Sequence, residues 1–385
     1  MIFGIGAAGN KAAVNLIEKG IVSKEYVRLL NTTPKDIPDN YKNDKCFVQI
    51  SSALGGCGKE PNKGKAAMIE AIKNKTVDLG SMIPTFTKEV ILITSTEGGT
   101  GCGATPIVAK YFNAMNIPVH IFAFIGFQDE ARGMNNTLKF FRELNDNIIL
   151  HTIVNPEFLY FTGNYAKAEQ SANDYLAEQI RILLFSKLIV SSQNIDDTDQ
   201  YKISTTPGYM FTEHISLDGV KNVEMFNQTM SDALDNNKCL DYNRGCKRLA
   251  IIINASNKVK DAIDDKMEVI KRYVGEPFET FRHIQDDEQS GDWIDIIASG
   301  MSFPEKGIID LSKKYNSVRD KLNKDVKSFD DIFADIDISD DEDEFNMNLR
   351  EITNADIDNL FSDTKPKKKK EKATIIIDDD ITSNY

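Results

Sequence analysis

A short glycine-rich stretch is the part of this sequence whose residue types most clearly suit chemistry. It spans residues 97–106 and holds four glycines between Gly98 and Gly103. An apolar run at 90–94 precedes it and a helical pattern follows, so we expect a strand, a turn and a helix start, with Pro106 in the first helical turn. Backbone N–H groups that no side chain covers suit an anion such as phosphate at a helix start. The alternative is a connection that binds nothing.

A second glycine stretch lies at the start of the chain, where a short strand from Ile2 is predicted to run into a loop. Gly4, Gly6 and Gly9 match G-x-G-x-x-G, the pattern of dinucleotide-binding loops. That pattern usually comes with an acidic residue about 20 positions later, at the end of the second strand. Here the second strand ends at Asn31, which has no charge but can still hydrogen-bond a ribose or a base.

A third glycine stretch, residues 55–64, also precedes a predicted helix. Its Gly58-Lys59 pair lacks the Ser or Thr and the spacing of a Walker A loop. Strands alternate with helices over the first 125 residues, which predicts a parallel sheet covered on both faces. All three glycine stretches would then lie at the carboxyl edge of that sheet and converge on one phosphate-bearing ligand. The predicted strands of this part include 26–30, 90–94 and 119–125.

The second half of the chain predicts a long central helix and a smaller α/β region. The helical pattern from about Tyr165 to Val190 is the longest, and it ends in a polar turn containing Asp196, Asp197 and Asp199. Three close aspartates are compatible with a metal loop, but an EF-hand glycine and glutamate are missing, so a solvated turn is the simpler interpretation. The region beyond it predicts strands at 209–215, 248–254 and 293–300, helices at 220–234 and 259–274, and a polar helix at 306–327.

Composition describes a globular protein without a membrane segment. Of the 385 residues, 41% are hydrophobic and 27% are charged, and no apolar run approaches the length of a membrane span. Five cysteines without a CxxC pair indicate a reduced, cytoplasmic protein, and Cys102 is read as a small residue in a tight turn rather than a nucleophile. The segment from Ser328 to Tyr385 has 17 acidic and 7 basic residues, which predicts a disordered tail. The nearly neutral remainder shows no broad basic face for nucleic acid.

Taken in order, the motifs over about residues 1–303 resemble the tubulin/FtsZ superfamily of GTPases. Residues 98–103 resemble its phosphate loop G-G-T-G-[ST]-G, with Cys102 at the fifth position, and residues 4–10 resemble its first glycine loop. Asn155-Pro156 stands where the family contacts the ribose, and Asn173 stands at the start of the central helix, where an Asn reads guanine. Residues 194–199 fit N-x-D-x-x-D, the loop that closes that helix.

The resemblance implies a nucleotide site for GTP or GDP, with Mg²⁺ bound mainly through the nucleotide phosphates. The implied nucleotide-binding residues are Gly6, Ala7, Ala8, Asn10, Asn31, Gly98, Gly99, Thr100, Gly101, Cys102, Gly103, Glu130, Asn155, Pro156 and Asn173. The implied catalytic residues are Asp196 and Asp199, together with Asn194, acting on the nucleotide of the next subunit. Hydrolysis then requires head-to-tail assembly, and such a contact generates a filament when it does not close.

Within the superfamily the chain is most similar to the TubZ group, which segregates plasmid or phage DNA. Ala7-Ala8 replaces the glycines of FtsZ, Met134 occupies the position of a guanine-stacking Arg, and an acidic spacer with a Lys run replaces the FtsZ C-terminal peptide. The resemblance implies a small DNA-binding adaptor that binds the C-terminal tail. An FtsZ-like division scaffold is the first alternative, and a NAD-dependent oxidoreductase, suggested by Gly4, Gly6 and Gly9 alone, is the second.

The predicted organisation is an α/β, tubulin/FtsZ-like protein with a Rossmann-like GTP-binding domain. We expect that domain at 1–164, a central helix and closing loop at 165–199, an activation domain at 200–303, a helix at 304–327 and a flexible tail at 328–385. The expected location is the cytoplasm of a bacterial cell.

Overall fold

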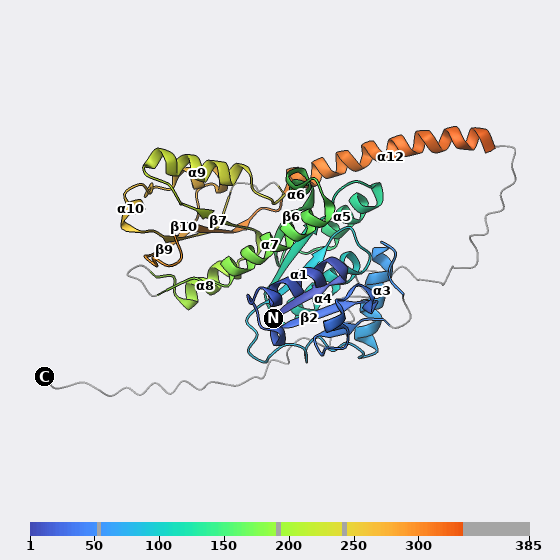
Figure 1. Cartoon of the computed structure of the whole chain (residues 1–385). Helices are drawn as coiled ribbons and strands as arrows, with labels where there is room; N and C mark the ends of the chain where they lie inside the picture. The colour runs from blue at the N-terminus through green and yellow to red at the C-terminus, as the bar shows by residue number, and fades with distance from the viewer. Residues whose placement is uncertain (52–54, 190–193, 241–244, 334–385) are drawn as a thin grey trace, which may run out of the picture.

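The computed structural model describes residues 1–51, 55–189, 194–240 and 245–333, with side chains described to Lys321. Its strands form one ten-stranded sheet within these ranges, in the order β3-β2-β1-β4-β5-β6-β7-β10-β8-β9. Figure 1 shows the sheet running through the molecule, with helices on its faces and α12 extending away from the body. The fold is therefore of the α/β class that the sequence predicts, and both predicted α/β regions contribute to one mixed sheet.

Six parallel strands form the first part of the sheet. They are β1 (Ile2–Ile5), β2 (Val27–Asn31), β3 (Phe47–Gln49), β4 (Val90–Ser95), β5 (Val119–Ile125) and β6 (Ile148–Val154). The central strands β1, β5 and β6 are buried along their whole length, as expected where helices cover both faces of a parallel sheet. The edge strand β3 has three half-buried or exposed residues and no apolar run, so periodicity did not predict it.

Four strands form the second part of the sheet. They are β7 (Gly208–Ser216), β8 (Arg248–Asn254), β9 (Glu279–Gln285) and β10 (Trp293–Met301). Strand β7 continues the parallel order through two residue pairs with β6, whereas β10 is antiparallel to both β7 and β8. The sequence did not predict β9, because Phe281 and Ile284 are the only large apolar residues among its seven and they do not alternate with polar ones. The sheet therefore ends at β9, and β10 lies inside it.

Helices cover the two faces with separate hydrophobic clusters. On one face α1 (Gly6–Glu18) and α7 (Tyr165–Leu183) pack in one cluster, with Ile203 of α8 (Asp197–Ser204). The other cluster contains residues of α3 (Pro61–Lys73), α4 (Thr100–Ala114), α5 (Ala131–Glu143), α9 (Val223–Asp235) and α11 (Glu268–Val274). The remaining short helices are α2 (Asp39–Lys42), α6 (Asn155–Thr162) and α10 (Asn257–Lys260).

Two helix predictions are corrected by the structure. The central helix α7 has 19 residues and ends at Leu183 rather than Val190, because Phe185 has a φ of 50° and leaves the helical path. The helix predicted at 259–274 is divided into α10 and α11, because Met267 also has a positive φ, of 52°, in the polar turn between them. Both interruptions depend on a positive φ at a single residue, which the spacing of hydrophobic residues does not predict.

The C-terminal helix is longer than predicted. Helix α12 (Glu305–Phe333) has 29 residues and is thus longer than α7, and it continues beyond the predicted end at Lys327. It packs against α5 and then extends from the body (Figure 1). The predicted tail therefore begins after Phe333 at the earliest, and residues 334–385 lie outside the described residues. Within the described ranges, no helix combines the length and the apolar character needed to cross a membrane.

Candidate nucleotide site

Two adjoining cavities lie at the carboxyl ends of the parallel strands. The loop cavity, of about 320 Å³, lies between the start of α4, the start of α1 and the segment after β2. The helix cavity, of about 270 Å³, lies between the start of α1, the segment after β5 and the first half of α7. Ala7, Ala8, Ser95 and Gly98 line both, so the two cavities share a wall. A ligand longer than either cavity can therefore occupy both.

Two helices begin at this shared wall. Helix α1 starts at Gly6, immediately after β1, so the predicted loop between them does not exist. Helix α4 starts at Thr100, and Gly6 packs against it with a φ of 76°. A Cβ added at Gly101 would lie 2.4 Å from Oγ1 of Thr94. The start of α4 can therefore approach the end of β4 this closely only with glycine at position 101. The free N–H groups of both first turns thus face one region, which suits phosphate groups.

The expected position of Pro106 in the first turn of α4 is wrong. The helix begins six residues earlier, at Thr100, and Pro106 lies inside it. Because proline has no N–H, the carbonyl one turn earlier in α4 receives no helical hydrogen bond from it. The glycine pattern misled the prediction, because Gly101 and Gly103 are helical residues here.

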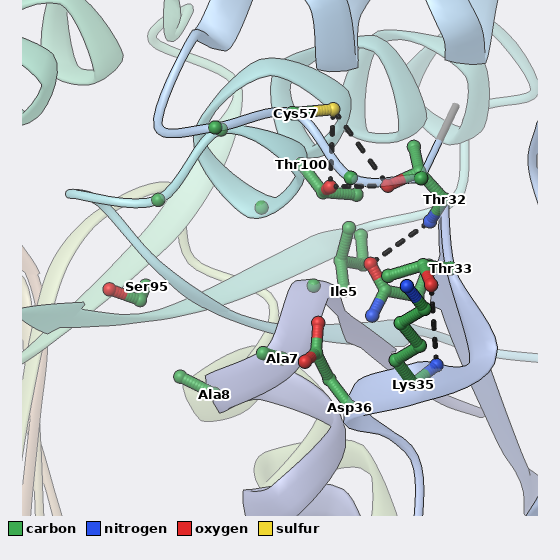
Figure 2. A pocket seen from close by; sticks show the side chains of 18 residues that line it. Ile5, Ala7, Ala8, Thr32, Thr33, Lys35, Asp36, Cys57, Ser95 and Thr100 are labelled. Carbon is green, nitrogen blue, oxygen red and sulfur yellow. Dashed lines mark hydrogen bonds between the residues drawn. The ribbon is translucent and has the colours of Figure 1, made fainter.

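The loop cavity has a polar wall opposite the glycines. Oγ1 of Thr32 lies 3.0 Å from Oγ1 of Thr100, and Thr100 donates to Sγ of Cys57 at 3.4 Å, as Figure 2 shows. The amide oxygen of Asn31 accepts a hydrogen bond from the N–H of Thr32, but its buried amide nitrogen has no partner among the described residues. A buried donor without a partner is unfavourable, so its place in the cavity wall favours an anionic ligand there.

The exposed rim of the loop cavity adds two charged side chains. Lys35 and Asp36 both line the cavity on the far side from α7, and Figure 2 shows them beside Thr33 and Ala7. An ammonium group suits a terminal phosphate, and a carboxylate beside hydroxyl groups suits a hard cation such as Mg²⁺. This end of the cavity therefore fits the highly charged end of a ligand.

The helix cavity has a different character. Phe127 and the backbone of Gly126 form one side, and Ala172 and Asn173 of α7 form another. Asn155 contributes a buried amide oxygen that has no partner among the described residues. An aromatic ring beside polar side chains suits a nucleobase and its sugar, and the order along both cavities is then base, sugar and phosphates.

Most of the predicted binding residues meet at these cavities. Those that line the loop cavity are Gly6, Ala7, Ala8, Asn31, Gly98, Gly99, Thr100 and Gly101, and those that line the helix cavity include Asn155 and Asn173. The prediction that Asn31 contacts a ribose or base does not fit its position, because it lies with the loop-cavity residues at the phosphate end.

Five predicted binding residues lie elsewhere. Asn10 is fully buried and donates to the carbonyl of Leu30 at 3.1 Å, and Pro156 is simply the second residue of α6. Cys102 and Gly103 line a separate cavity on the other side of α4. Glu130 forms an ion pair with Lys59 and lines neither nucleotide cavity. Burial also raises the pKa of the Cys102 thiol to about 12, which agrees with a packing role.

The sequence prediction missed several lining residues. These are Lys11, Thr32, Thr33, Lys35, Asp36, Cys57, Lys59, Ser95, Glu97, Phe127 and Glu169. Cys57 and Lys59 lie in the third glycine stretch, which the sequence did place at the same edge of the sheet. Lys11 and Glu169 form an ion pair at 3.5 Å between α1 and α7, and nothing in the local sequence pattern links these two helices.

The predicted catalytic acids lie at the other end of α7. Asp196 caps α8, because its Oδ1 accepts the N–H of Asp199 at 2.8 Å, and Asp199 is half-buried while Asn194 is exposed. Neither aspartate is among the described residues that line the two cavities. Leu183 lies ten positions after Asn173 in α7, which corresponds to about 15 Å of helix. The acids therefore cannot reach a nucleotide bound to their own subunit.

A partly buried ionic cluster joins α7 to β7 and β10. Glu178, His214 and Asp295 bring their ligand atoms within 4.8 Å of one another, as a metal site would. However, the guanidinium of Arg181 lies among them, 2.9 Å from Oδ2 of Asp295 and 2.6 Å from Oε1 of Glu178. Because this cation already pairs with both acids, we interpret the cluster as an ion-pair network.

The fold and the two cavities define a nucleotide-binding α/β protein whose phosphate-binding backbone lies at two helix starts. Comparison with known proteins identifies the family that this nucleotide-binding region resembles. The family model described as "Tubulin/FtsZ family, GTPase domain" matches residues 1–160, which hold the phosphate loop and the segments around it. Residues 1–160 therefore match a GTPase domain of the tubulin/FtsZ family, which implies that the chain hydrolyses GTP.

Individual similar proteins carry three different names, FtsZ, TubZ and CetZ. The cell division protein FtsZ of Mycoplasmopsis pulmonis is 24% identical over 345 residues, which covers 85% of this chain and 82% of that protein. TubZ of Clostridium botulinum phage c-st matches with a TM-score of 0.63 at 18% identity, over 83% of this chain and 98% of that one. A GTPγS-bound CetZ2 protofilament from Haloferax volcanii matches with a TM-score of 0.64 at 15% identity, covering 83% and 98%. These structural likenesses establish the fold.

Proposed function

We propose that this protein is a filament-forming GTPase that hydrolyses GTP at the contact between successive subunits. The observation that carries the proposal is the position of Asp196 and Asp199, which lie beyond the end of α7 and away from the nucleotide cavities. A head-to-tail contact would place the acids of one subunit over the open cavity of the next. Because both ends of each subunit remain available, such contacts repeat without closing and form a filament.

In this arrangement each group has a separate task. The first turns of α1 and α4 hold the phosphates, and Asn31 and Lys35 contact the terminal phosphate. Mg²⁺ bound through the phosphates would offset their charge, and Asp36 with the hydroxyl groups of Thr32 and Thr33 is a donor set that fits it. Asp196 and Asp199 would polarise the attacking water from the next subunit. The solved relatives that form protofilaments or filaments support the assembly.

The proposal is tested by GTP hydrolysis as a function of protein concentration, with sedimentation in parallel. We expect phosphate release and pelletable polymer to appear together above one threshold concentration, with GTP and not with ATP or NAD. Hydrolysis that is linear in concentration without polymer would refute hydrolysis at the contact. The NAD control also addresses the oxidoreductase alternative, which the GTPase family match already disfavours.

For the cellular role we propose DNA segregation in the bacterial cytoplasm. TubZ structures support this choice, including a two-stranded filament of TubZ-Bt that matches with a TM-score of 0.67 at 14% identity, over 88% of this chain and 92% of that one. A small DNA-binding adaptor would bind the tail after Phe333. The competing role is division, which the FtsZ relatives favour. Depletion of the protein separates them, because loss of a plasmid or phage genome indicates segregation and loss of septation indicates division.

A further inference from the structure

The nucleotide placement of the proposed function leaves the middle of the helix cavity for the sugar. Asn173 stands at one end of this cavity, and Ala7, Ala8 and Gly98 stand at the end shared with the phosphate-binding turns. The rest of the lining includes Glu97, Gly126 and Asn155, and a nucleotide that spans both ends would place its ribose beside this part of the wall. The two ribose hydroxyl groups are hydrogen-bond donors, and they require acceptors at this point.

Glu97 is held in this wall by the surrounding backbone. A Cβ at Gly126 would lie 1.9 Å from its Oε2, and a Cβ at Gly133 would lie 2.8 Å from its Cδ, so both glycines make room for the carboxylate. The N–H of Gln128 donates to Oε1 at 3.2 Å, which orients the group. The other oxygen receives no hydrogen bond that we find among the described residues. Glu97 thus has a fixed direction and spare acceptor capacity.

The other carboxylates near this wall are already engaged. Glu130 pairs with Lys59, Glu169 pairs with Lys11 at 3.5 Å, and Asp129 accepts a hydrogen bond from the hydroxyl of Tyr165 at 3.3 Å. Burial raises the pKa of Glu97, and the charges of Asp129 and Glu130 raise it further. Hydrogen-bond donors from a ligand would stabilise the ionised carboxylate of Glu97 in these surroundings.

We propose that Glu97 accepts hydrogen bonds from the ribose hydroxyl groups and makes the site selective for ribonucleotides over deoxyribonucleotides. The buried oxygen of Asn155 supplies a second acceptor at the same place. A hydrogen bond to a charged group stabilises a complex by about 1.5–3 kcal/mol, so removing one hydroxyl weakens binding by about tenfold or more. Glu97 acts on recognition and takes no part in the hydrolysis step.

The test compares the affinities of the full chain for GTP, 2′-deoxy-GTP and 3′-deoxy-GTP, below the concentration at which it assembles. We expect the wild type to bind GTP about tenfold more tightly than the weaker-binding deoxy analogue. We expect Glu97→Gln to narrow this ratio to about threefold or less, because an amide is the weaker acceptor. The matched control is Asp129→Asn, a neighbouring acid outside the cavity wall, which should keep the wild-type ratio.

Equal affinity of the wild type for all three nucleotides would overturn the proposal without any variant. An unchanged ratio in Glu97→Gln, with a normal melting temperature, would overturn it equally. Glu97→Asp is the second variant in case the amide disturbs folding. The shorter aspartate keeps the charge but cannot extend as far toward the cavity. It should also reduce the ratio of the affinity for GTP to that for the weaker-binding deoxy analogue. These are binding measurements, so they are independent of filament formation, whereas failure to bind any guanine nucleotide would refute the proposed function itself.

Discussion

Two glycines of the predicted glycine stretches, Gly9 and Gly98, have different tasks. A Cβ at Gly9 would lie 2.1 Å from the carbonyl oxygen of Ile93, whereas a Cβ at Gly98 would meet nothing within 4 Å. Gly9 thus permits α1 to pack on β4, and Gly98 keeps space open for the ligand. We expect Gly9→Ala to lower the melting temperature, and Gly98→Ala to leave it unchanged while weakening GTP binding. Thermal unfolding and nucleotide titration of both variants check this, and equal effects on stability would contradict it.

Asp196 combines a structural and a proposed catalytic role. Its side chain caps α8, and loss of such a cap destabilises a protein by about 1 kcal/mol. We expect both Asp196→Ala and Asp196→Asn to abolish GTP turnover, because neither can polarise water as a carboxylate does. Only the alanine variant should lose stability, because asparagine retains the capping oxygen. Normal turnover in Asp196→Asn with GTP binding intact would remove Asp196 from the mechanism.

At the scale of elements, the Arg181 cluster determines how firmly α7 is joined to β10. The side chains of Arg181 and Asp295 are only 11% and 3% exposed, so removing the cation leaves a buried carboxylate without its main partner. We expect Arg181→Met to lower the free energy of unfolding by about 3–5 kcal/mol. The double variant Arg181→Met with Asp295→Leu should recover much of this loss. Urea unfolding measures both, and additive losses would contradict the pairing.

A second contact between α7 and the sheet depends on pH. Tyr175 donates to Oε2 of Glu213 at 2.9 Å, and burial raises the pKa of Glu213 to about 7. Because this folded-state pKa exceeds the unfolded one, the folded protein binds more protons between about pH 4.5 and 7, and the stabilising contribution is lost as pH rises through that window. We expect the stability difference between wild type and Glu213→Gln to fall by at most about 1.4 kcal/mol per pH unit there. A pH-independent difference would refute this assignment.

The elements that sequence patterns predicted are those with long apolar runs. Strands β4, β5, β8 and β10 are confirmed, because nearly complete burial selects continuous hydrophobic residues. The start of α7 at Tyr165 is confirmed by its helical spacing of apolar residues. The misses, β3 and β9, are edge strands, and the end of α7 depends on a single positive φ at Phe185. Within the site, backbone-binding glycines were predictable from the sequence. Glu97 and the Lys11–Glu169 pair were not, because tertiary packing brings them to the cavity.

At the scale of the whole molecule, the separation of cavity and acids predicts complementation between inactive variants. Asp199→Asn should bind GTP but supply no functional acid, and Gly98→Val should retain the acids but fill the cavity. Each is expected to be inactive alone. A mixture should regain hydrolysis wherever an intact acid meets an intact cavity. Phosphate release and sedimentation of the mixture check this, and co-sedimentation without any regained activity would contradict catalysis between subunits.

In the proposed head-to-tail filament, the length of α7 also makes the two ends chemically different. One terminal subunit offers a nucleotide cavity that no neighbour covers, and the other offers acids with no nucleotide beneath them. An assembly of n subunits therefore contains n cavities but n − 1 complete active sites. A dimer would work at half the rate per subunit of a long filament, and short fragments would hydrolyse GTP more slowly than the same mass of protein left unbroken. Turnover per subunit thus becomes a measure of average filament length.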